Sequence, residues 1–170
     1  MFETRRDHVF SLVADVPVFN DQKTRGVEAD FDLEATARWR ITANATFQHA
    51  RLTDNPSNPA AAGKWPQGVP ARIAHLWTCY QVTGGKANGL RIAAGLEYRS
   101  RLYGNILNTN SVPAYLTAQA RLSWSAARWE LSAGVRNLFD RTWFIAANGA
   151  GALVGEPRTL FASARLRFGT

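Results

Sequence analysis

The feature that most constrains the fold of this chain is a period of two in its hydrophobic pattern. Near the C-terminus, Leu160, Ala162 and Ala164 alternate with Ser163 and Arg165. Successive side chains of a strand point to opposite sides of a sheet, so this alternation predicts one apolar and one polar side. Helical periodicity is hard to find, and the same alternation recurs along the chain, which predicts an all-β fold. Eight strands are expected, at residues 5–14, 26–35, 39–53, 71–83, 89–101, 114–125, 128–140 and 157–168.

The links between these predicted strands alternate in length. Short turns are expected at residues 36–38, 84–88 and 126–127, and longer links at 15–25, 54–70, 102–113 and 140–156. In an antiparallel up-and-down meander, alternate links lie at opposite ends, so every long link falls at the same end. Transmembrane β-barrels have short turns on one side of the membrane and long loops on the other. The pattern therefore favours a meander whose apolar side faces lipid.

Strand length and the positions of aromatic residues agree with this interpretation. Strands of about 10 to 13 residues match a tilted crossing of the hydrocarbon layer. Aromatic residues gather near strand ends, where the two water–lipid boundaries would lie. These residues are Trp39, Tyr98, Tyr103, Tyr115, Trp124, Trp129, Trp143, Phe144 and Phe168. The alternative is that they form the core of a soluble sandwich.

Charge excludes one class of partner and leaves two environments open. The net charge is +7, but the basic residues are scattered at strand-like intervals and form no concentrated patch, which argues against nucleic-acid binding. A ladder of carboxylates occupies the polar side of the second predicted strand, at Glu28, Asp30, Asp32 and Glu34. Paired with arginines, these carboxylates suit a wet barrel lumen, and they equally suit the solvated outside of a soluble barrel.

Few residues have the spacing that chemistry requires. The single cysteine excludes an internal disulfide framework. His75 and Cys79 share a strand face but lie about 13 Å apart, too far for one metal ion. No nucleophile and base can be paired. We therefore expect no enzyme, no metal and no cofactor. No apolar run is long enough for a membrane helix, and the N-terminus lacks the order of a signal peptide.

Several motifs carry a family resemblance. An NLFD motif, Asn137, Leu138, Phe139 and Asp140, is followed by the aromatic residues Trp143 and Phe144. Gly155, Pro157 and Arg158 belong to a G-x-P-R motif that opens the last predicted strand. Upstream, RGVEADFDLEATARWRITANATFQHARLTD contains an RGVE strand pair. Together these segments resemble the C-terminal part of the barrel of TonB-dependent outer-membrane receptors of the ferric-siderophore type.

The resemblance implies a fold and a location. The chain, residues 1–170, is expected to be the C-terminal section of a larger transmembrane β-barrel in the outer membrane, surrounded by outer-membrane lipid. The family's barrel has about 22 strands and a plug domain. We expect an open, curved sheet of eight strands here, without plug or signal peptide. Members end on an aromatic residue, whereas here Gly169 and Thr170 follow Phe168.

The resemblance also implies a function, and two alternatives stay open. The family takes up ferric siderophores and is coupled to the TonB complex through the plug, so this section alone is not expected to transport. One alternative is a complete small eight-stranded outer-membrane barrel acting as an anchor or an enzyme. The other is a soluble ligand-binding β-barrel. A ladder between the first and last strands would favour these closed forms.

The motif residues have predicted structural roles. Asn137 and Asp140 are expected to hydrogen-bond their own backbone where a strand leaves for a loop. Pro157 lacks an N–H, so it is expected at the beginning of a strand. Arg158 is expected to reach Asp140 across the hairpin, with two parallel hydrogen bonds if both side chains are partly buried.

Ligand contacts are expected in the long external loops. Aromatic side chains and amides suit a polar, partly aromatic iron chelate. The candidate residues are Trp65, Tyr103, Trp143 and Phe144.

Overall fold

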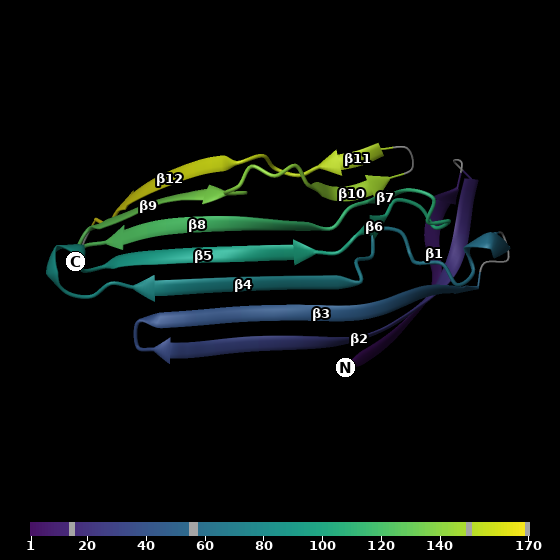
Figure 1. The fold of residues 1–170 in the computed structure, drawn as a ribbon, viewed down its shortest axis with the longest axis horizontal. Coiled ribbons are helices and arrows are strands. Elements are labelled where there is room, and N and C mark those ends of the chain that lie inside the picture. Colours follow the sequence, from purple (N-terminus) through teal and green to yellow (C-terminus); the bar gives the residue numbers. More distant parts are fainter. Residues whose placement is uncertain (14–15, 55–57, 149–150, 169–170) are drawn as a thin grey trace.

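The structure, a computed structural model, describes residues 1–13, 16–54, 58–148 and 151–168. Its main feature is an antiparallel sheet of eight strands in the order β1-β2-β3-β4-β5-β8-β9-β12 (Figure 1). The strands are β1 (Phe2–Val13), β2 (Val16–Thr36), β3 (Trp39–Asp54), β4 (Arg72–Gln81), β5 (Leu90–Arg99), β8 (Tyr115–Ser125), β9 (Trp129–Arg136) and β12 (Thr159–Leu166). The predicted all-β meander is confirmed.

The links separate into two ends of the sheet, as their lengths predicted. Figure 1 shows the turns β2–β3, β4–β5 and β8–β9 at one end, with the C-terminus. The longer links at the other end carry small elements of their own. These elements are the 3₁₀ turn η1 (Pro59–Ala61), the pair β6 (Leu102–Tyr103) and β7 (Ser111–Val112), and the pair β10 (Phe144–Asn148) and β11 (Gly151–Val154). A second 3₁₀ turn, η2 (Gly85–Ala87), lies in the β4–β5 turn. Among the described residues, no helix has the length and apolarity to cross a membrane.

The prediction of a long link at residues 15–25 is wrong. β2 begins at Val16, and its first half pairs with β1 from Val13 and Val16 to Phe2 and Gly26, with one shift of register between Arg6 and Val9. Residues 14–15, between the two strands, lie outside the described residues. This half of β2 carries no apolar stripe, so its strand character was hidden from a search for hydrophobic alternation.

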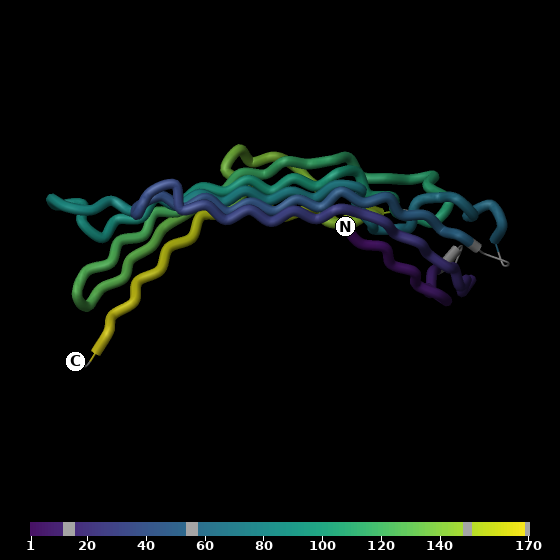
Figure 2. Tube along the Cα trace, turned by 90° about the horizontal axis from the view of Figure 1, so that it is seen from below, coloured from purple at the N-terminus to yellow at the C-terminus, as the bar shows by residue number. Residues whose placement is uncertain are grey.

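The sheet is open. β1 and β12 stand at the two ends of the strand order, and Figure 2 shows the sheet bent into an arch. The predicted open, curved sheet is confirmed, and no pairing of β12 with β1 occurs among the described residues. This topology contradicts both closed alternatives, the complete small barrel and the soluble ligand-binding barrel.

Seven of the strands share one apolar face, because their registers align the alternation from strand to strand. The residue pairs Val27 and Phe47, Leu76 and Leu96, and Ile92 and Leu122 lie side by side in the ladders. We call this surface the apolar face and the opposite one the polar face. The apolar face comprises Val27, Ala29, Phe31, Leu33, Ile41, Ala43, Ala45, Phe47, Ala74, Leu76, Tyr80, Ile92, Ala94, Leu96, Tyr98, Leu116, Ala118, Ala120, Leu122, Trp124, Trp129, Leu131, Ala133, Val135, Leu160, Ala162, Ala164 and Leu166.

Burial on the two faces is the reverse of that in a water-soluble sheet. In β5, Ile92 and Leu96 on the apolar face are 46% and 41% exposed, whereas Ala93 on the polar face is 8% exposed. Soluble monomers rarely leave a contiguous apolar patch larger than a few hundred Å² uncovered. The apolar face is therefore not the core of a sandwich, because no second sheet covers it among the described residues.

The apolar face has the dimensions of a membrane-crossing band. From Trp39 to Phe47 along β3 it extends for about 27 Å at ~3.4 Å per residue, close to the ~25 Å band of outer-membrane barrels. A row of aromatic residues borders it at the short-turn end. The indole N–H groups of Trp39 and Trp124 donate to Thr78 Oγ1 (2.7 Å) and to the Asn88 carbonyl oxygen (3.1 Å). An aromatic ring that faces lipid and makes one polar contact through its N–H group is typical of a water–lipid boundary.

Two aromatic residues lie on the polar face over glycines of the neighbouring strand. Trp77 covers Gly95, and Phe161, the one residue that breaks the alternation of β12, covers Gly134. At either glycine a Cβ atom would overlap the ring. Glycine here provides the close approach that lets a large ring lie flat against the sheet.

Candidate functional site at the long-link end

The longer links pack onto the polar side of the extended ends of β2 and β3. A first apolar cluster joins Val18 and Leu52 of the strands to Ala61 and Ile106 of the two links, all at most 4% exposed. Asn108 fixes the two links to each other, since its Nδ2 donates to the Trp65 carbonyl oxygen (2.8 Å) and its Oδ1 accepts from the Trp65 amide (2.9 Å). The links therefore form one packed layer with a small core of its own, which we call the loop layer.

The last link joins the same layer. Leu102, Val112 and Ala147 form a second buried cluster, and Phe144 packs against it. The β6–β7 pair thus contacts β10 on one side, while Ile106 from the same link reaches the first cluster. All three links are held in fixed positions relative to the sheet.

The NLFD motif anchors the start of the last link, as predicted for Asn137. This side chain is 5% exposed. Its Oδ1 accepts from the Arg141 amide (3.0 Å), and its Nδ2 donates to the carbonyl oxygens of Arg141 (2.8 Å) and Glu156 (3.1 Å). Asn137 and Asp140 both have positive φ values, 48° and 52°, which asparagine and aspartate tolerate better than most residues. The remaining motif residues Leu138 and Phe139 are exposed, at 38% and 67%.

The G-x-P-R motif anchors the end of the same link. Arg158 does meet Asp140 across the hairpin, but through its backbone amide, which donates to Asp140 Oδ1 (2.9 Å). The guanidinium is 3.8 Å from Asp140 Oδ2 and both side chains are about half exposed, so the bidentate geometry does not form. Gly155 is covered by the Trp143 ring, and Pro157 lies two residues before β12 begins.

A small cavity opens on the polar face beneath this link. It has a volume of about 140 Å³, and its walls include Glu97, Thr117, Gln119, Arg136, Trp143 and Glu156. We call it the mouth cavity. Its residues come from three adjacent strands of the sheet and from the two ends of the last link.

The charges of the mouth cavity are nearly balanced. Arg136 Nε is 3.5 Å from Glu156 Oε2, and Glu97 Oε1 accepts a hydrogen bond from the Tyr115 hydroxyl (2.8 Å). The Tyr115 ring stacks at a tilt on Trp143, with 4.6 Å between ring centroids. The cavity therefore combines an aromatic wall with charged groups that already have partners.

Two polar side chains of the cavity are available for a ligand. Within the described residues, neither Thr117 nor Gln119 makes a side-chain hydrogen bond. A hydroxyl and an amide offer both donors and acceptors. With the Trp143 ring beside them, they suit part of a polar, partly aromatic ligand.

The structure separates the four predicted ligand-contact residues. Trp143 lines the mouth cavity, whereas Phe144 packs into the second apolar cluster. Trp65 contacts the His49 ring edge to face (5.6 Å between ring centroids) and the Arg51 guanidinium (5.2 Å from its ring centroid). Its indole N–H donates to the Val69 carbonyl oxygen (2.6 Å). Tyr103 is half-buried in β6, where its carbonyl oxygen accepts from the Gly68 amide (2.9 Å). The four do not form one site.

Sequence reasoning missed the strand residues of the mouth cavity. Glu97, Thr117 and Arg136 lie on the polar face of β5, β8 and β9. The same alternation that predicted the strands places them on one side, so that signal was present. What was absent was the knowledge that the last link folds over this part of the polar face.

Known proteins resemble the chain at two levels. The family described as TonB dependent receptor-like, beta-barrel, matches residues 1–138. A probable TonB-dependent siderophore receptor, PiuA, of Acinetobacter baumannii is 28% identical over 137 residues, covering 75% of this chain and 18% of the relative. The ferrioxamine B receptor of Salmonella typhimurium is 24% identical over 152 residues, covering 86% of this chain and 21% of the relative.

The fold has a close counterpart among solved structures. The crystal structure of the siderophore receptor PiuA from Acinetobacter baumannii superimposes with a TM-score of 0.80 at 24% identity. The superposition covers 95% of this chain and 25% of that one, so it extends beyond residue 138, where the family match ends. The chain spans about a fifth of the length of the two curated relatives, which are covered to 18% and 21%. Its open sheet and uncovered apolar face are those of a section of an outer-membrane barrel wall, and the chain belongs to the TonB-dependent receptor-like β-barrel family.

Proposed function

We propose that this chain supplies part of the wall and three external loops of an outer-membrane receptor that takes up ferric siderophores. The names of its relatives, a siderophore receptor and a ferrioxamine B receptor, support the substrate class. The observation that most supports the proposal is the burial of the two faces. The apolar face of the sheet is uncovered, and the polar face is covered at one end by packed loops. Lipid on one side and a wet lumen on the other account for both.

Residues 1–170 are, on this proposal, the C-terminal section of the barrel. A sheet with two free edges encloses no lumen, so other strands of the receptor must complete the wall. Coupling to the TonB complex requires the plug, which lies in another part of the receptor. On its own, the section therefore contributes membrane-spanning strands but transports no siderophore.

Trp143 is the predicted ligand-contact residue that this proposal retains. It borders the mouth cavity beside Thr117 and Gln119, whose side chains make no hydrogen bond to another described residue. A cavity of about 140 Å³ is below the usual 300–1,000 Å³ of a whole small-molecule site. The proposal assigns it one edge of a chelate whose other contacts come from the rest of the barrel. Ligand contacts of Trp65, Tyr103 and Phe144 stay predictions. These three residues make packing contacts within the loop layer.

The experiment is a segment exchange. The matching section of the receptor PiuA is replaced by this chain, and uptake of ferric siderophore is measured in cells that lack their own receptor. We expect uptake from the exchanged receptor, none from this chain expressed alone, and a severalfold weaker uptake from the exchanged receptor carrying Trp143→Ala.

Assembly is checked separately by the heat-dependent gel mobility of the folded barrel. Phe139→Ala serves as a matched control, because this aromatic residue of the same link is 67% exposed and does not line the cavity. An exchanged receptor that assembles normally in the outer membrane and takes up no iron chelate would contradict the proposal.

A further inference from the structure

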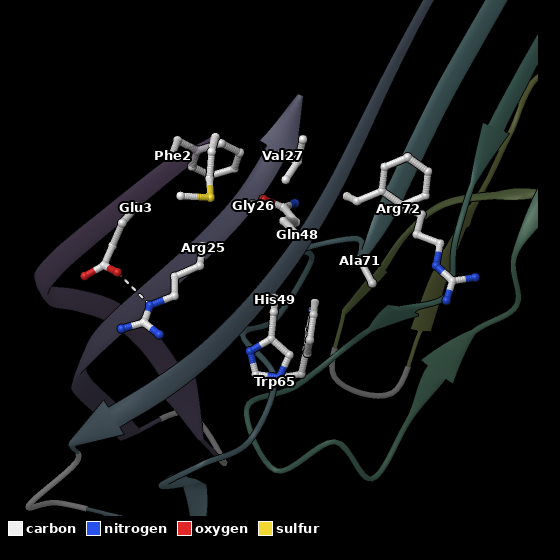
Figure 3. A pocket seen from close by; sticks show the side chains of 12 residues that line it. Phe2, Glu3, Arg25, Gly26, Val27, Gln48, His49, Trp65, Ala71 and Arg72 are labelled. Atoms are coloured by element: carbon white, nitrogen blue, oxygen red, sulfur yellow. Dashed lines mark hydrogen bonds and ion pairs between the residues drawn. The ribbon is translucent and has the colours of Figure 1, made fainter. Parts of the chain in front are cut away.

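A second and larger cavity lies on the other side of the sheet, where β1, β2 and β3 extend past the apolar face. It has a volume of about 870 Å³ and its walls include Phe2, Glu3, Arg25, Phe47, His49 and Arg72 (Figure 3). In Figure 3, Arg25 and Arg72 stand on opposite sides of His49 and Trp65. We call this the rim cavity.

The register places the basic residues of the rim cavity on the lipid side of the sheet. Val27 pairs with Phe47, and Phe47 pairs with Arg72 across β3 and β4. Arg25 is two residues before Val27, so it has the same facing. The last apolar row of the wall is therefore followed, towards the long-link end, by arginine side chains.

Basic charge exceeds acidic charge at this rim. Glu3 is the one carboxylate in the wall, and it is shared by Lys23 (2.9 Å) and Arg25 (2.6 Å). The hydrogen bond from Lys23, reinforced by Arg25, lowers the pKa of the Glu3 carboxyl, which lies beyond the apolar face. Arg72 is exposed, and its guanidinium has no ion pair within the part of the chain that the structure describes. Three basic side chains thus face one carboxylate.

The two arginines can reach a common anion. They lie on β2 and β4, on either side of β3 and two residues out of register, which separates their Cα atoms by about 12 Å. Arginine side chains are long and bind phosphate oxygens with paired N–H groups. In Figure 3 the Arg25 guanidinium points towards Glu3 and the Arg72 guanidinium points away from it, so both side chains turn inward to bind a phosphate above Phe47.

A shallow groove in the apolar face begins directly below this position. Ala29, Ala45 and Ala74 form the next row of the ladders beneath Val27, Phe47 and Arg72. Small side chains make a depression of about 410 Å³ there, and Phe31, Leu76 and Tyr98 are among the larger side chains around it. The rim cavity and this groove are neighbours along the strands, as the head group and the acyl chain of one lipid molecule are.

We propose that the rim cavity and the alanine groove together bind one lipid of the outer leaflet whose phosphate gives it a net negative charge, with that phosphate between Arg25 and Arg72 and an acyl chain over Ala29, Ala45 and Ala74. The site rests on the proposed placement of the apolar face in the membrane, and it adds a specific lipid contact to that placement. A phosphate bound at the rim and an acyl chain bound in the groove would hold the sheet at one depth in the membrane.

The experiment measures lipid retained by the detergent-solubilised chain in native mass spectrometry, with lipid A and phosphatidylcholine as probes. We expect one lipid A to be retained in preference to phosphatidylcholine. Arg72→Gln should weaken lipid A about fivefold, from the loss of one basic residue at an anionic surface. Ala45→Phe should weaken it by filling the groove, and Glu3→Gln should tighten it.

Arg121→Gln is the matched control, because this exposed arginine lies on the polar face of β8. It should leave lipid A retention unchanged. Retention by the unmodified chain should also fall as salt rises, which tests the phosphate contact without any substitution. Inorganic phosphate in excess should not displace lipid A, because it cannot occupy the groove.

Four outcomes would overturn the lipid site. They are equal retention of lipid A and phosphatidylcholine, equal retention by the Arg72 and Arg121 variants, full displacement by inorganic phosphate, and a second copy of the chain in place of the lipid. Flotation of the chain with neutral vesicles tests the membrane placement separately. A chain that floats but shows no lipid preference contradicts this site alone, and one that does not float contradicts the proposed function.

Discussion

The two halves of β2 differ in what each of their sides meets. In residues 27–36 the apolar side chains, such as Phe31 (53% exposed), are uncovered and the carboxylates lie opposite them. In residues 16–26 the sides exchange character. Lys23 and Arg25 continue the direction of Phe31, whereas Val18 (4% exposed) lies on the carboxylate side beneath the loop layer.

This difference shows that one strand can pass from one environment into another without a break. The ladder with β3 pairs Gly26 and Val27 in regular succession and continues back to Gln22, so the surroundings change at Gly26 and Val27 while the pairing does not. Below that point one side meets lipid and the other the lumen. Above it, one side meets water and the other the packed loops. The composition of each half follows its own solvent.

The largest expected effect comes from placing a charge on the lipid side. Leu96→Arg, in the middle of the apolar face, should destabilise the chain in lipid vesicles by about 2–4 kcal/mol, as measured by urea unfolding. Gln119→Arg, on the polar face of the neighbouring strand, is the matched control and should change stability by less than about 0.5 kcal/mol. Equal effects of the two substitutions would mean that the faces meet the same solvent.

The next effect sharpens the comparison by truncating leucines in the two environments. Leu52 is 2% exposed in the loop-layer core, so Leu52→Ala should cost about 3 kcal/mol of local stability. Leu96→Ala should cost less than about 1 kcal/mol, because lipid tails are as apolar as leucine and fill the space. Hydrogen exchange of residues 58–71 and 102–112 should accelerate in the first variant only. Acceleration in both would indicate that Leu96 belongs to a protein core.

A smaller effect is expected where the polar face carries a large ring. A Cβ atom at Gly95 overlaps the Trp77 ring, so Gly95→Ala should cost about 1–2 kcal/mol through overpacking. In a Trp77→Leu background the same substitution should cost almost nothing, because the ring is gone. Unfolding midpoints of the unmodified chain, the two single variants and the double variant measure this coupling, and additive effects would refute the contact.

The smallest effect concerns the exposed ion pairs of the polar face. Arg40 bonds Asp32 with both Nε (3.0 Å) and Nη2 (2.9 Å), but both side chains are more than half exposed. Solvent screens such a pair strongly. Asp32→Asn should leave the unfolding midpoint unchanged at physiological salt, and a clear loss would mean that this face is enclosed.

The part of the sheet that carries the apolar face was predicted well from the sequence, because one physical signal, apolar alternation, determines it. That signal fails in residues 16–25, where the outward side chains meet water and the inward ones meet loops. Lys23 and Gln22 give no contrast between the two sides, and a continuous strand was therefore expected to be a loop. Its partner β1 was only weakly patterned for the same reason.

The candidate site was less predictable, since it depends on how the links fold. The alternation of β5, β8 and β9 gives the facing of Glu97, Thr117 and Arg136, but no local pattern predicts that Trp143 closes over them. The role of Asn137 was predictable, because its side chain needs only its own loop backbone. Trp65 needed knowledge of contacts with Asn108 from a distant link.

The central claim, that one side of the sheet changes from lipid to water at residue 26, is tested most directly by spin-label accessibility in lipid vesicles. Nitroxides are attached singly at Phe31→Cys, Lys23→Cys and Asp30→Cys in a Cys79→Ser background. The account predicts that the label at position 31 is accessible to oxygen and protected from a water-soluble nickel reagent, while those at 23 and 30 are accessible to nickel. A label at position 31 that is as accessible to nickel as the label at 23, or shielded from both reagents, would contradict it.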